Sequence, residues 1–376
     1  MSRNSISKNI KVSDIQVFPL FIPFKRPHRI SLGLAEGREI LVAKVTTTSG
    51  IVGVGEAVAH PAFSGETLES LRGAIDYLKE CVVGRDPLNI NQINNLMDKR
   101  LYGNYGAKAA IEMALLDIKG KYFQVPVYDL LGGKMQEKLP LSRSVSQSNI
   151  EKDIEEANKF VKEGYRIIKI KVGVLNIKQD IQRVKAVREE VGPEISLRVD
   201  ANQGWSVPAA LKFIEKTKEY NLEFIEQPLP KWNIDGLAYL RNKSVIPIMA
   251  DEAATTEHDV LEIIRRKAAD FISIKVIKCG GIMKARKILS LAESAGIQCY
   301  LGSQAETSIG TLASLHLALS TEKFTYGGEI YGPVFFAENI VKEPPRIENG
   351  FIYPYDKPGL GVELDEDKVR DLLIKG

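Results

Sequence analysis

The sequence predicts an α/β protein in which a parallel β/α barrel follows an N-terminal α+β module. From about residue 138, short β-branched segments alternate with amphipathic helical segments. Charged residues recur at the ends of these strand segments with nearly the period of the repeat. The 376 residues suffice for two domains, and 44% hydrophobic against 26% charged residues is typical of a globular chain.

The N-terminal module is expected to contain a small antiparallel sheet followed by helices. Residues 10–58 contain three extended segments. Residues 67–131 have helical periodicity, which ends at Gly132-Gly133. We therefore expect residues 1–135 to form one α+β domain.

Residues 136–348 are expected to form the barrel, because strand and helix segments alternate there at a regular length. The strand candidates are PLSRSV at 140–145, RIIKIKV at 166–172, SLRVDAN at 196–202, FIEQPL at 224–229, PIMADEA at 247–253, FISIKV at 271–276 and QCYLGS at 298–303. Residues 349–376 are expected to return to the N-terminal domain.

Alternation along the strand at 166–172 turns lysines into the barrel. Ile168 and Ile170 must face the outer helices, so Lys169 and Lys171 face inward. An unpaired charge inside a barrel costs on the order of several kcal/mol. This placement therefore favours a site over a purely structural role.

Five charged residues end successive strand segments at intervals of 24 to 29 residues: Lys171, Asp200, Glu226, Asp251 and Lys275. Each taken alone has a plainer interpretation, such as a turn residue for Asp200 or a helix N-cap for Asp251. The carboxyl ends of parallel barrel strands meet at one rim, so the periodic set predicts that these side chains converge.

The three carboxylates predict a divalent cation. Oxygen donors with no nearby thiolate and no histidine in the strand motifs suit Mg²⁺ or Mn²⁺ better than zinc. Three lysines and one divalent cation against three carboxylates leave a charge of about +2. A small-molecule dicarboxylate would balance this charge.

Bulk composition indicates no macromolecular partner. The net charge is only +3, with 51 basic and 48 acidic residues interspersed, so we expect neither nucleic acid nor membrane as a partner. Cys81, Cys279 and Cys299 form no CxxC pair, and the N-terminus is polar without a signal-like apolar segment. We expect a cytoplasmic protein with no disulfide framework.

Five strand-end motifs resemble those of the enolase superfamily, in its muconate-lactonizing subgroup: KIKVG at 169–173, RVDANQGW at 198–205, IEQPLP at 225–230, MADEA at 249–253 and SIKVIKCGG at 273–281. The resemblance covers nearly the whole chain, including RPHRISLG at 26–33 and GVGEA at 53–57. It implies a modified TIM (β/α)7β barrel with an N-terminal α+β capping domain, and a homo-oligomer, often an octamer.

The resemblance also implies roles for single residues. It makes Asp200, Glu226 and Asp251 the metal ligands. Lys171 and Lys275 become the acid/base pair, and Lys169 orients Lys171 and lowers its pKa, as a neighbouring ammonium should. A further set is expected to contact the substrate or support these groups: His28, Asn202, Glu252, Lys278, Glu306 and Glu329. For Lys278, contact with solvent or its own loop remains equally open.

Members of this subgroup share the same lysines and metal, so other segments must indicate the activity. Dipeptide epimerases carry an Asp-x-Asp pair where this chain has Glu329 and Tyr331, which disfavours a cationic substrate group. The segments at 302–314, 328–345 and 358–366 resemble muconate and chloromuconate cycloisomerases. The favoured reaction is syn lactonization of cis,cis-muconate to muconolactone through an enolate that Lys171 protonates.

Three alternatives remain open. One is dipeptide epimerase activity, and a second is N-acylamino-acid racemase or o-succinylbenzoate synthase activity. The third is a non-catalytic barrel that only binds a carboxylate.

Overall fold

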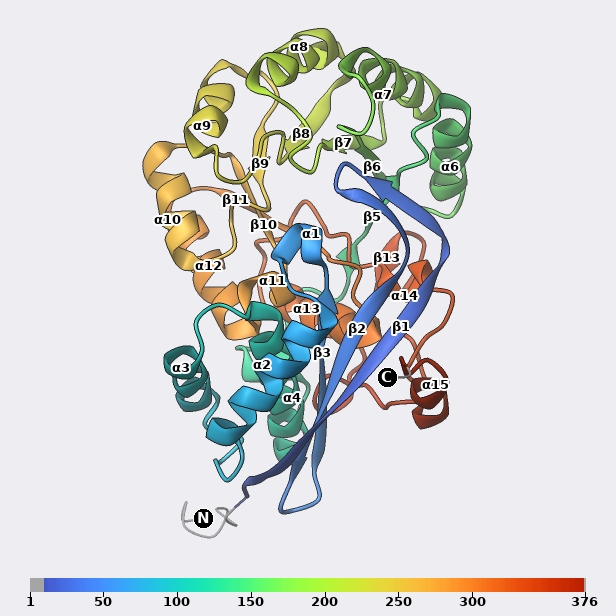
Figure 1. The fold of residues 1–376 in the computed structure, drawn as a ribbon. Helices are drawn as coiled ribbons and strands as arrows, with labels where there is room; N and C mark the ends of the chain where they lie inside the picture. The colour runs from blue at the N-terminus through green and yellow to red at the C-terminus, as the bar shows by residue number, and fades with distance from the viewer. Residues whose placement is uncertain (1–9, 375–376) are drawn as a thin grey trace.

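The computed structural model describes residues 10–374, which form an N-terminal cap against one end of a barrel (Figure 1). The cap elements are β1 (Val12–Ile30), β2 (Gly33–Thr47), β3 (Val52–Ala59), α1 (Pro61–Ser64), α2 (Leu68–Val82), α3 (Ile90–Arg100), α4 (Tyr105–Phe123) and α5 (Val127–Leu130). Strands β1, β2 and β3 form an antiparallel sheet in that order. The predicted sheet followed by helices is therefore present.

The cap is held together by close packing of β3 on α4. A Cβ atom placed on Gly55 would lie 2.0 Å from the carbonyl oxygen of Ala110, and one on Gly53 would lie 2.1 Å from that of Ala114. The facing residues of α4 are small, so sheet and helix meet backbone to backbone. Only glycine fits at these two positions of β3.

The barrel elements follow in regular alternation. Its strands are β5 (Ser142–Val145), β6 (Ile167–Lys171), β7 (Ser196–Asp200), β8 (Leu222–Glu226), β9 (Ile248–Ala250), β10 (Phe271–Ile274) and β11 (Gln298–Leu301). The helices between and after them are α6 (Ile150–Lys162), α7 (Ile177–Val191), α8 (Val207–Thr217) with η2 (Lys218–Tyr220), α9 (Ile234–Lys243), α10 (Glu257–Arg266), α11 (Val276–Cys279), α12 (Ile282–Ser294) and α13 (Ser308–Leu319).

The seven strands lie side by side in chain order and pair in parallel. Gly328 closes the gap between the two edges, because it bridges Leu301 at the end of β11 and Leu141 just before β5. The predicted barrel is therefore present, and a single bridging residue stands where an eighth strand would close it. Several of the outer helices begin at a side-chain cap, such as Asn149 for α6 and Thr256 for α10.

The chain end passes back along the cap. The short strand β4 (Leu139–Pro140) pairs with the hairpin of β12 (Ile347–Glu348) and β13 (Phe351–Ile352). After α14 (Gly332–Phe335) and that hairpin, α15 (Glu366–Asp371) leads to Leu373, which bridges Leu20 of β1.

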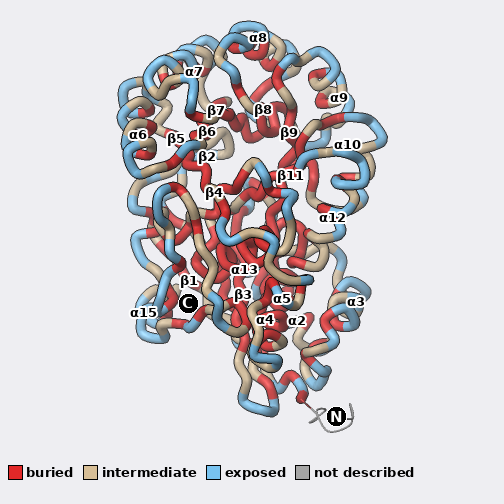
Figure 2. The backbone as a smooth tube through the Cα atoms, turned by 180° about the vertical axis from the view of Figure 1, so that it is seen from behind, coloured by how far each residue is buried: buried red, intermediate tan, exposed pale blue. Residues whose placement is uncertain are grey.

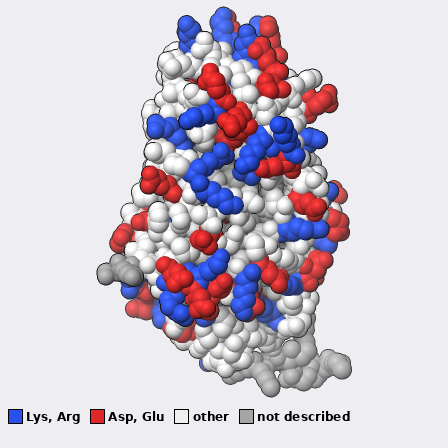
Figure 3. Space-filling view, turned by 90° about the vertical axis from the view of Figure 1, so that its right-hand side faces the viewer, with Lys and Arg blue, Asp and Glu red and all other residues white. Residues whose placement is uncertain are grey.

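Burial is concentrated in the barrel strands, α4 and α13, as Figure 2 shows from behind. On the face shown in Figure 3, lysine and arginine alternate with aspartate and glutamate without a large region of one sign. The three cysteines are free. Among the helices described, none has the length and apolar character needed to cross a membrane.

Candidate active site

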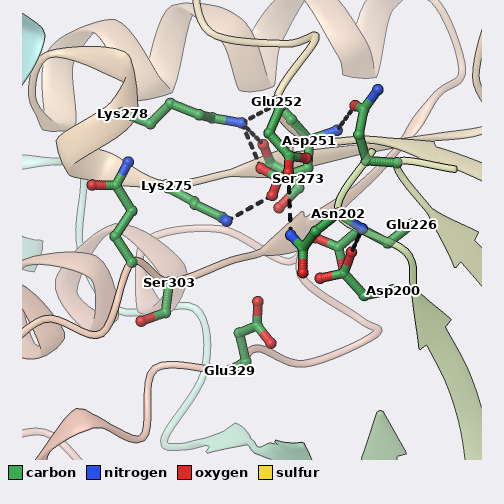
Figure 4. A network of polar contacts seen from close by, with 12 residues as sticks. Asp200, Asn202, Glu226, Asp251, Glu252, Ser273, Lys275, Lys278, Ser303 and Glu329 are labelled. Carbon is green, nitrogen blue, oxygen red and sulfur yellow. Dashed lines mark hydrogen bonds and ion pairs between the residues drawn. The ribbon is translucent and has the colours of Figure 1, made fainter. Parts of the chain in front are cut away.

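The five periodic charged residues meet at one end of the barrel. In the strand register Lys171 stands opposite Asp200, and Asp200 stands opposite Glu226. Asp251 directly follows β9 and Lys275 directly follows β10, so all five occupy the carboxyl ends of neighbouring strands. Each is less than a tenth exposed. Figure 4 shows Asp200, Glu226, Asp251 and Lys275 pointing toward a common region, with Glu329 on its opposite side.

Lysines and carboxylates are paired across this region. The Nζ of Lys171 lies 2.6 Å from Asp200 Oδ2, and the Nζ of Lys275 lies 2.6 Å from Asp251 Oδ2. The fully buried Lys169 pairs twice, with Glu226 at 2.5 Å. Its second partner is Glu329, at 2.7 Å. These pairs compensate most of the charge that the strands bring inward.

A second layer of polar residues holds this network. Lys278 donates to Asp251 Oδ1 at 2.9 Å and to the carbonyl oxygens of Asp251 and Ser273. Lys278 is buried and lies outside the cavity lining. Of the predicted alternatives, support of Asp251 describes it, and contact with solvent does not. Asn202 donates to Glu252 at 3.2 Å and accepts from Lys171 at 3.3 Å. Glu252 thus supports Asn202.

The pKa values follow from burial and from these pairs. Burial, and then repulsion by Asp200, raises the pKa of Glu226 to about 8. Burial also tends to raise the pKa of Asp251, but Lys275 and Lys278 outweigh it and leave that pKa below its usual range. Burial and repulsion by Asp251 and Asp200 raise the pKa of Glu252 to about 8 as well.

The expectation that the pKa of Lys171 is lowered is wrong for this structure. Burial lowers it, and Lys169 contributes in the same direction, but attraction to Asp200 and Glu329 leaves the Lys171 pKa above its ordinary value. The carboxylates around the ammonium outweigh the neighbouring lysine. A cation bound between these carboxylates would offset their negative charge and so lower the pKa of Lys171.

The three carboxylates fit a hard divalent cation by donor chemistry. Within residues 10–374 no three histidine, cysteine, aspartate or glutamate side chains are gathered closely enough to hold a metal ion as they stand. Their oxygens are instead paired with lysines. However, Oε1 of Glu226 is buried with no hydrogen-bond partner, and Glu226 feels repulsion from both Asp200 and Asp251. A cation would satisfy that oxygen and relieve the repulsion.

A cavity of about 60 Å³ lies where cap and barrel meet. The barrel contributes Lys171, Asn202, Lys275 and Glu329, among others. The predicted cap residue His28 lines it and forms a 2.9 Å hydrogen bond with Ser146. The three predicted metal ligands are not part of the lining. They lie behind the lysines.

The predicted residue Glu306 lies next to the cavity rather than in its wall. It accepts a hydrogen bond from Ser303 and another from the backbone N–H of Gln304 at 2.8 Å. Those two residues and Ala305 line the cavity. Glu306 therefore shapes the loop that forms one wall.

Sequence reasoning missed three cap contributions to the cavity: Arg38, His60 and Phe63. Ile30, which also lines it, lies in the segment at 26–33 that carries the resemblance. Arg38 shortly precedes four consecutive buried residues of β2: Ile40, Leu41, Val42 and Ala43. Buried and exposed residues do not alternate there, so the sequence does not predict which face of β2 turns toward the cavity. His60 lines the cavity directly after the end of β3.

Known proteins resemble this chain over more than nine-tenths of its length. Residues 13–132 match the mandelate racemase / muconate lactonizing enzyme N-terminal domain, and residues 152–368 match the enolase C-terminal domain-like family. An N-succinyl-L-Arg/Lys racemase of Bacillus cereus is 38% identical, covering 97% of this chain and 98% of that protein.

Cycloisomerases are similarly related. Muconate cycloisomerase 1 of Acinetobacter baylyi is 36% identical, covering 93% of this chain and 96% of that protein. The crystal structure of muconate lactonizing enzyme from Pseudomonas fluorescens, complexed with muconolactone, superimposes with a TM-score of 0.95 at 32% identity, covering 97% of this chain and 99% of that one.

Proposed function

Because this chain belongs to the mandelate racemase / muconate lactonizing enzyme family of the enolase superfamily, we propose that it is a muconate cycloisomerase that depends on Mg²⁺ or Mn²⁺. One observation carries the proposal. Lys171 and Lys275 line a single cavity from strands on either side of the three that carry Asp200, Glu226 and Asp251. Two proton-transferring groups thus flank one set of oxygen ligands.

The proposed reaction converts cis,cis-muconate to muconolactone. One carboxylate oxygen of the substrate forms a C–O bond to the conjugated double bond, and the π electrons move toward the other carboxylate. Lys171 then gives its proton to the carbon beside that carboxylate, so the dianionic substrate gains one proton, and the neutral lysine recovers a proton from solvent. In the reverse direction the same lysine removes that proton.

The residues around Lys171 suit this task. Lys169 is fixed by Glu226 and Glu329, so its ammonium stays beside Lys171 and favours the neutral form needed for proton removal. A divalent cation held by Asp200, Glu226 and Asp251 would neutralise the substrate carboxylate next to the reacting carbon. The cap covers this end of the barrel and limits the access of water.

The test is the absorbance of cis,cis-muconate in the presence of Mn²⁺. We expect an enzyme-dependent fall that EDTA abolishes, together with muconolactone detected by NMR. An unchanged absorbance with the metal-loaded, folded protein would contradict the proposal.

A second candidate is racemization of an N-acylated amino acid. It is favoured by the 38% identical N-succinyl-L-Arg/Lys racemase and by the two lysines, because racemization uses one base on each side of the α-carbon. Proton NMR in D₂O separates the two candidates. Racemization replaces the α-proton by deuterium without consuming the ligand, whereas lactonization forms a new compound.

A further inference from the structure

The cap places one unpaired cation in the cavity. Arg38 on β2 lines the cavity, and its Nε is buried without a hydrogen-bond partner. No carboxylate of residues 10–374 forms an ion pair with its guanidinium. Its one ring contact is with Phe24, 5.5 Å away. Arg38 is half-buried. Holding a guanidinium with a buried Nε and no anion is costly, which points to a ligand that supplies one.

No other group in the cavity can serve as that anion. Glu306 attracts Arg38 at a distance, but its two oxygens accept from Ser303 and from the Gln304 backbone. Glu329 is held by Lys169. The neighbouring cap residues His28 and His60 are neutral, because burial and then nearby cations, Arg38 among them, lower the pKa of each imidazole.

The cavity therefore has positive charge at two places. Lys171 and Lys275 come from the barrel strands, and Arg38 comes from the cap strand β2. An arginine fork binds a carboxylate through two parallel hydrogen bonds, which a lysine cannot do. A ligand with a carboxylate at each end could pair with the barrel lysines at one end and with Arg38 at the other.

We infer that Arg38 is a specificity-determining residue that binds the second carboxylate of a dicarboxylic ligand, so that the substrate class carries two carboxylates rather than one. The inference rests on the proposed function in one respect, which is that the first carboxylate binds at the barrel end. It applies equally to muconate and to an N-succinylated amino acid, since both carry two carboxylates.

The experiment compares ligands that differ only in the distal group. One pair is cis,cis-muconate and (2Z,4Z)-hexadienoate, in which a methyl group replaces one carboxylate. The other is N-succinylglycine and N-butyrylglycine, which differ in the same way. Binding to the Mg²⁺-loaded protein is measured by calorimetry, independently of turnover.

We expect the wild-type protein to bind the dianion of at least one pair roughly tenfold to hundredfold more tightly, the value of one or two charge-assisted hydrogen bonds. Arg38→Met should lose this preference, and Arg38→Lys should keep part of it. Arg72→Met is the matched control, because Arg72 is an exposed cation on α2 of the same cap. It should keep the wild-type preference.

The outcomes separate this inference from the proposed function. An unchanged preference in folded Arg38→Met, equal binding of both members of each pair, or no binding of either dianion overturns the role of Arg38. Suppose that Arg38→Met loses the preference, while the wild-type protein neither consumes muconate nor exchanges the α-protons of N-succinylglycine in D₂O. This result supports the role of Arg38 and overturns the cycloisomerase and racemase proposals. Because Arg38→Lys retains the charge, it keeps the test decisive if Arg38→Met fails to fold.

Discussion

At the scale of single residues, the site is a set of opposite charges that are buried together. Lys171 is held by Asp200, and attraction to the surrounding carboxylates keeps its pKa above the ordinary value. The Lys171 ammonium is thus a ready proton donor in the structure described here. A cation shared by Asp200 and Glu226 would lower that pKa and make proton removal accessible as well.

Replacing Lys171 should therefore affect chemistry more than binding. For Lys171→Ala we expect kcat to fall by about 10²- to 10⁴-fold with the fold intact by circular dichroism. Lys178→Ala is the control, since Lys178 is exposed on the next helix, α7. If the protein is a racemase, Lys171→Ala should still exchange the α-proton of one enantiomer in D₂O, through Lys275. A variant with wild-type kcat would rule out Lys171 as the proton donor.

At the scale of elements, the packing of β3 on α4 allows no side chain at two positions. A Cβ atom on Gly55 would overlap the Ala110 carbonyl, and backbone atoms on both sides cannot give way. Gly73 differs, because it lies exposed in α2 and an added Cβ would meet nothing within 4 Å. These two glycines make a matched pair.

We expect Gly55→Ala to lower the free energy of unfolding by at least about 2 kcal/mol. Gly73→Ala should raise it by roughly 0.5 to 1 kcal/mol, because alanine restricts the unfolded chain and favours helix. Urea denaturation measures both. Equal effects of the two substitutions would contradict the close approach of β3 and α4.

The junction between β3 and α13 contains a buried carboxyl group. Glu56 of β3 accepts a hydrogen bond from the Thr307 backbone at 2.8 Å and another from the Thr307 hydroxyl. Burial raises its pKa from 4.5 to about 8. Between these values the folded protein holds a proton that the unfolded chain releases. The stability contributed by Glu56 is therefore complete below pH 4.5 and is lost as pH rises through about 8.

For this one group the free energy of unfolding should fall by about 1.4 kcal/mol per pH unit in that window. Glu56→Gln should remove this slope, measured by urea denaturation between pH 5 and 9. Glu219→Gln, at an exposed position after α8, should leave it unchanged. An identical slope in Glu56→Gln and the wild-type protein would show that Glu56 titrates normally.

At the scale of the whole molecule, the cap and the barrel share one cavity. The hairpin of β1 and β2 reaches the barrel mouth, where the Ser31 hydroxyl donates to the Asn202 carbonyl oxygen at 2.5 Å. The proposed metal ligands come from the barrel alone. Metal binding and recognition of the distal carboxylate are thus assigned to different domains.

Metal binding should stabilise the whole protein. At Mg²⁺ concentrations about 100 times Kd, the free energy of unfolding should rise by about 2.7 kcal/mol. Asp200→Asn should lose most of this gain, whereas Asp76→Asn, at an exposed position of α2, should keep it. Thermal unfolding with and without EDTA measures the difference. Equal stabilisation of all three proteins would place the cation elsewhere.

The sequence by itself determined the barrel, the antiparallel sheet of the cap and the convergence of five charged residues. Strand alternation and the repeat length are local properties, and parallel strands in a barrel must bring their carboxyl ends to one rim. Lys169, Lys171 and Asp200 could therefore be placed before the structure was known.

Only the tertiary structure decided which cap residues enter the cavity and how the charges pair. Arg38 shortly precedes a stretch of β2 that is buried on both faces, residues 40–43, so no local pattern indicates the direction of its side chain. The raised pKa of Lys171 depends on carboxylates from β7 and from Glu329, far apart in the chain. Contacts between distant segments depend on how the whole chain packs, and the spacing of residues along one strand does not contain that information.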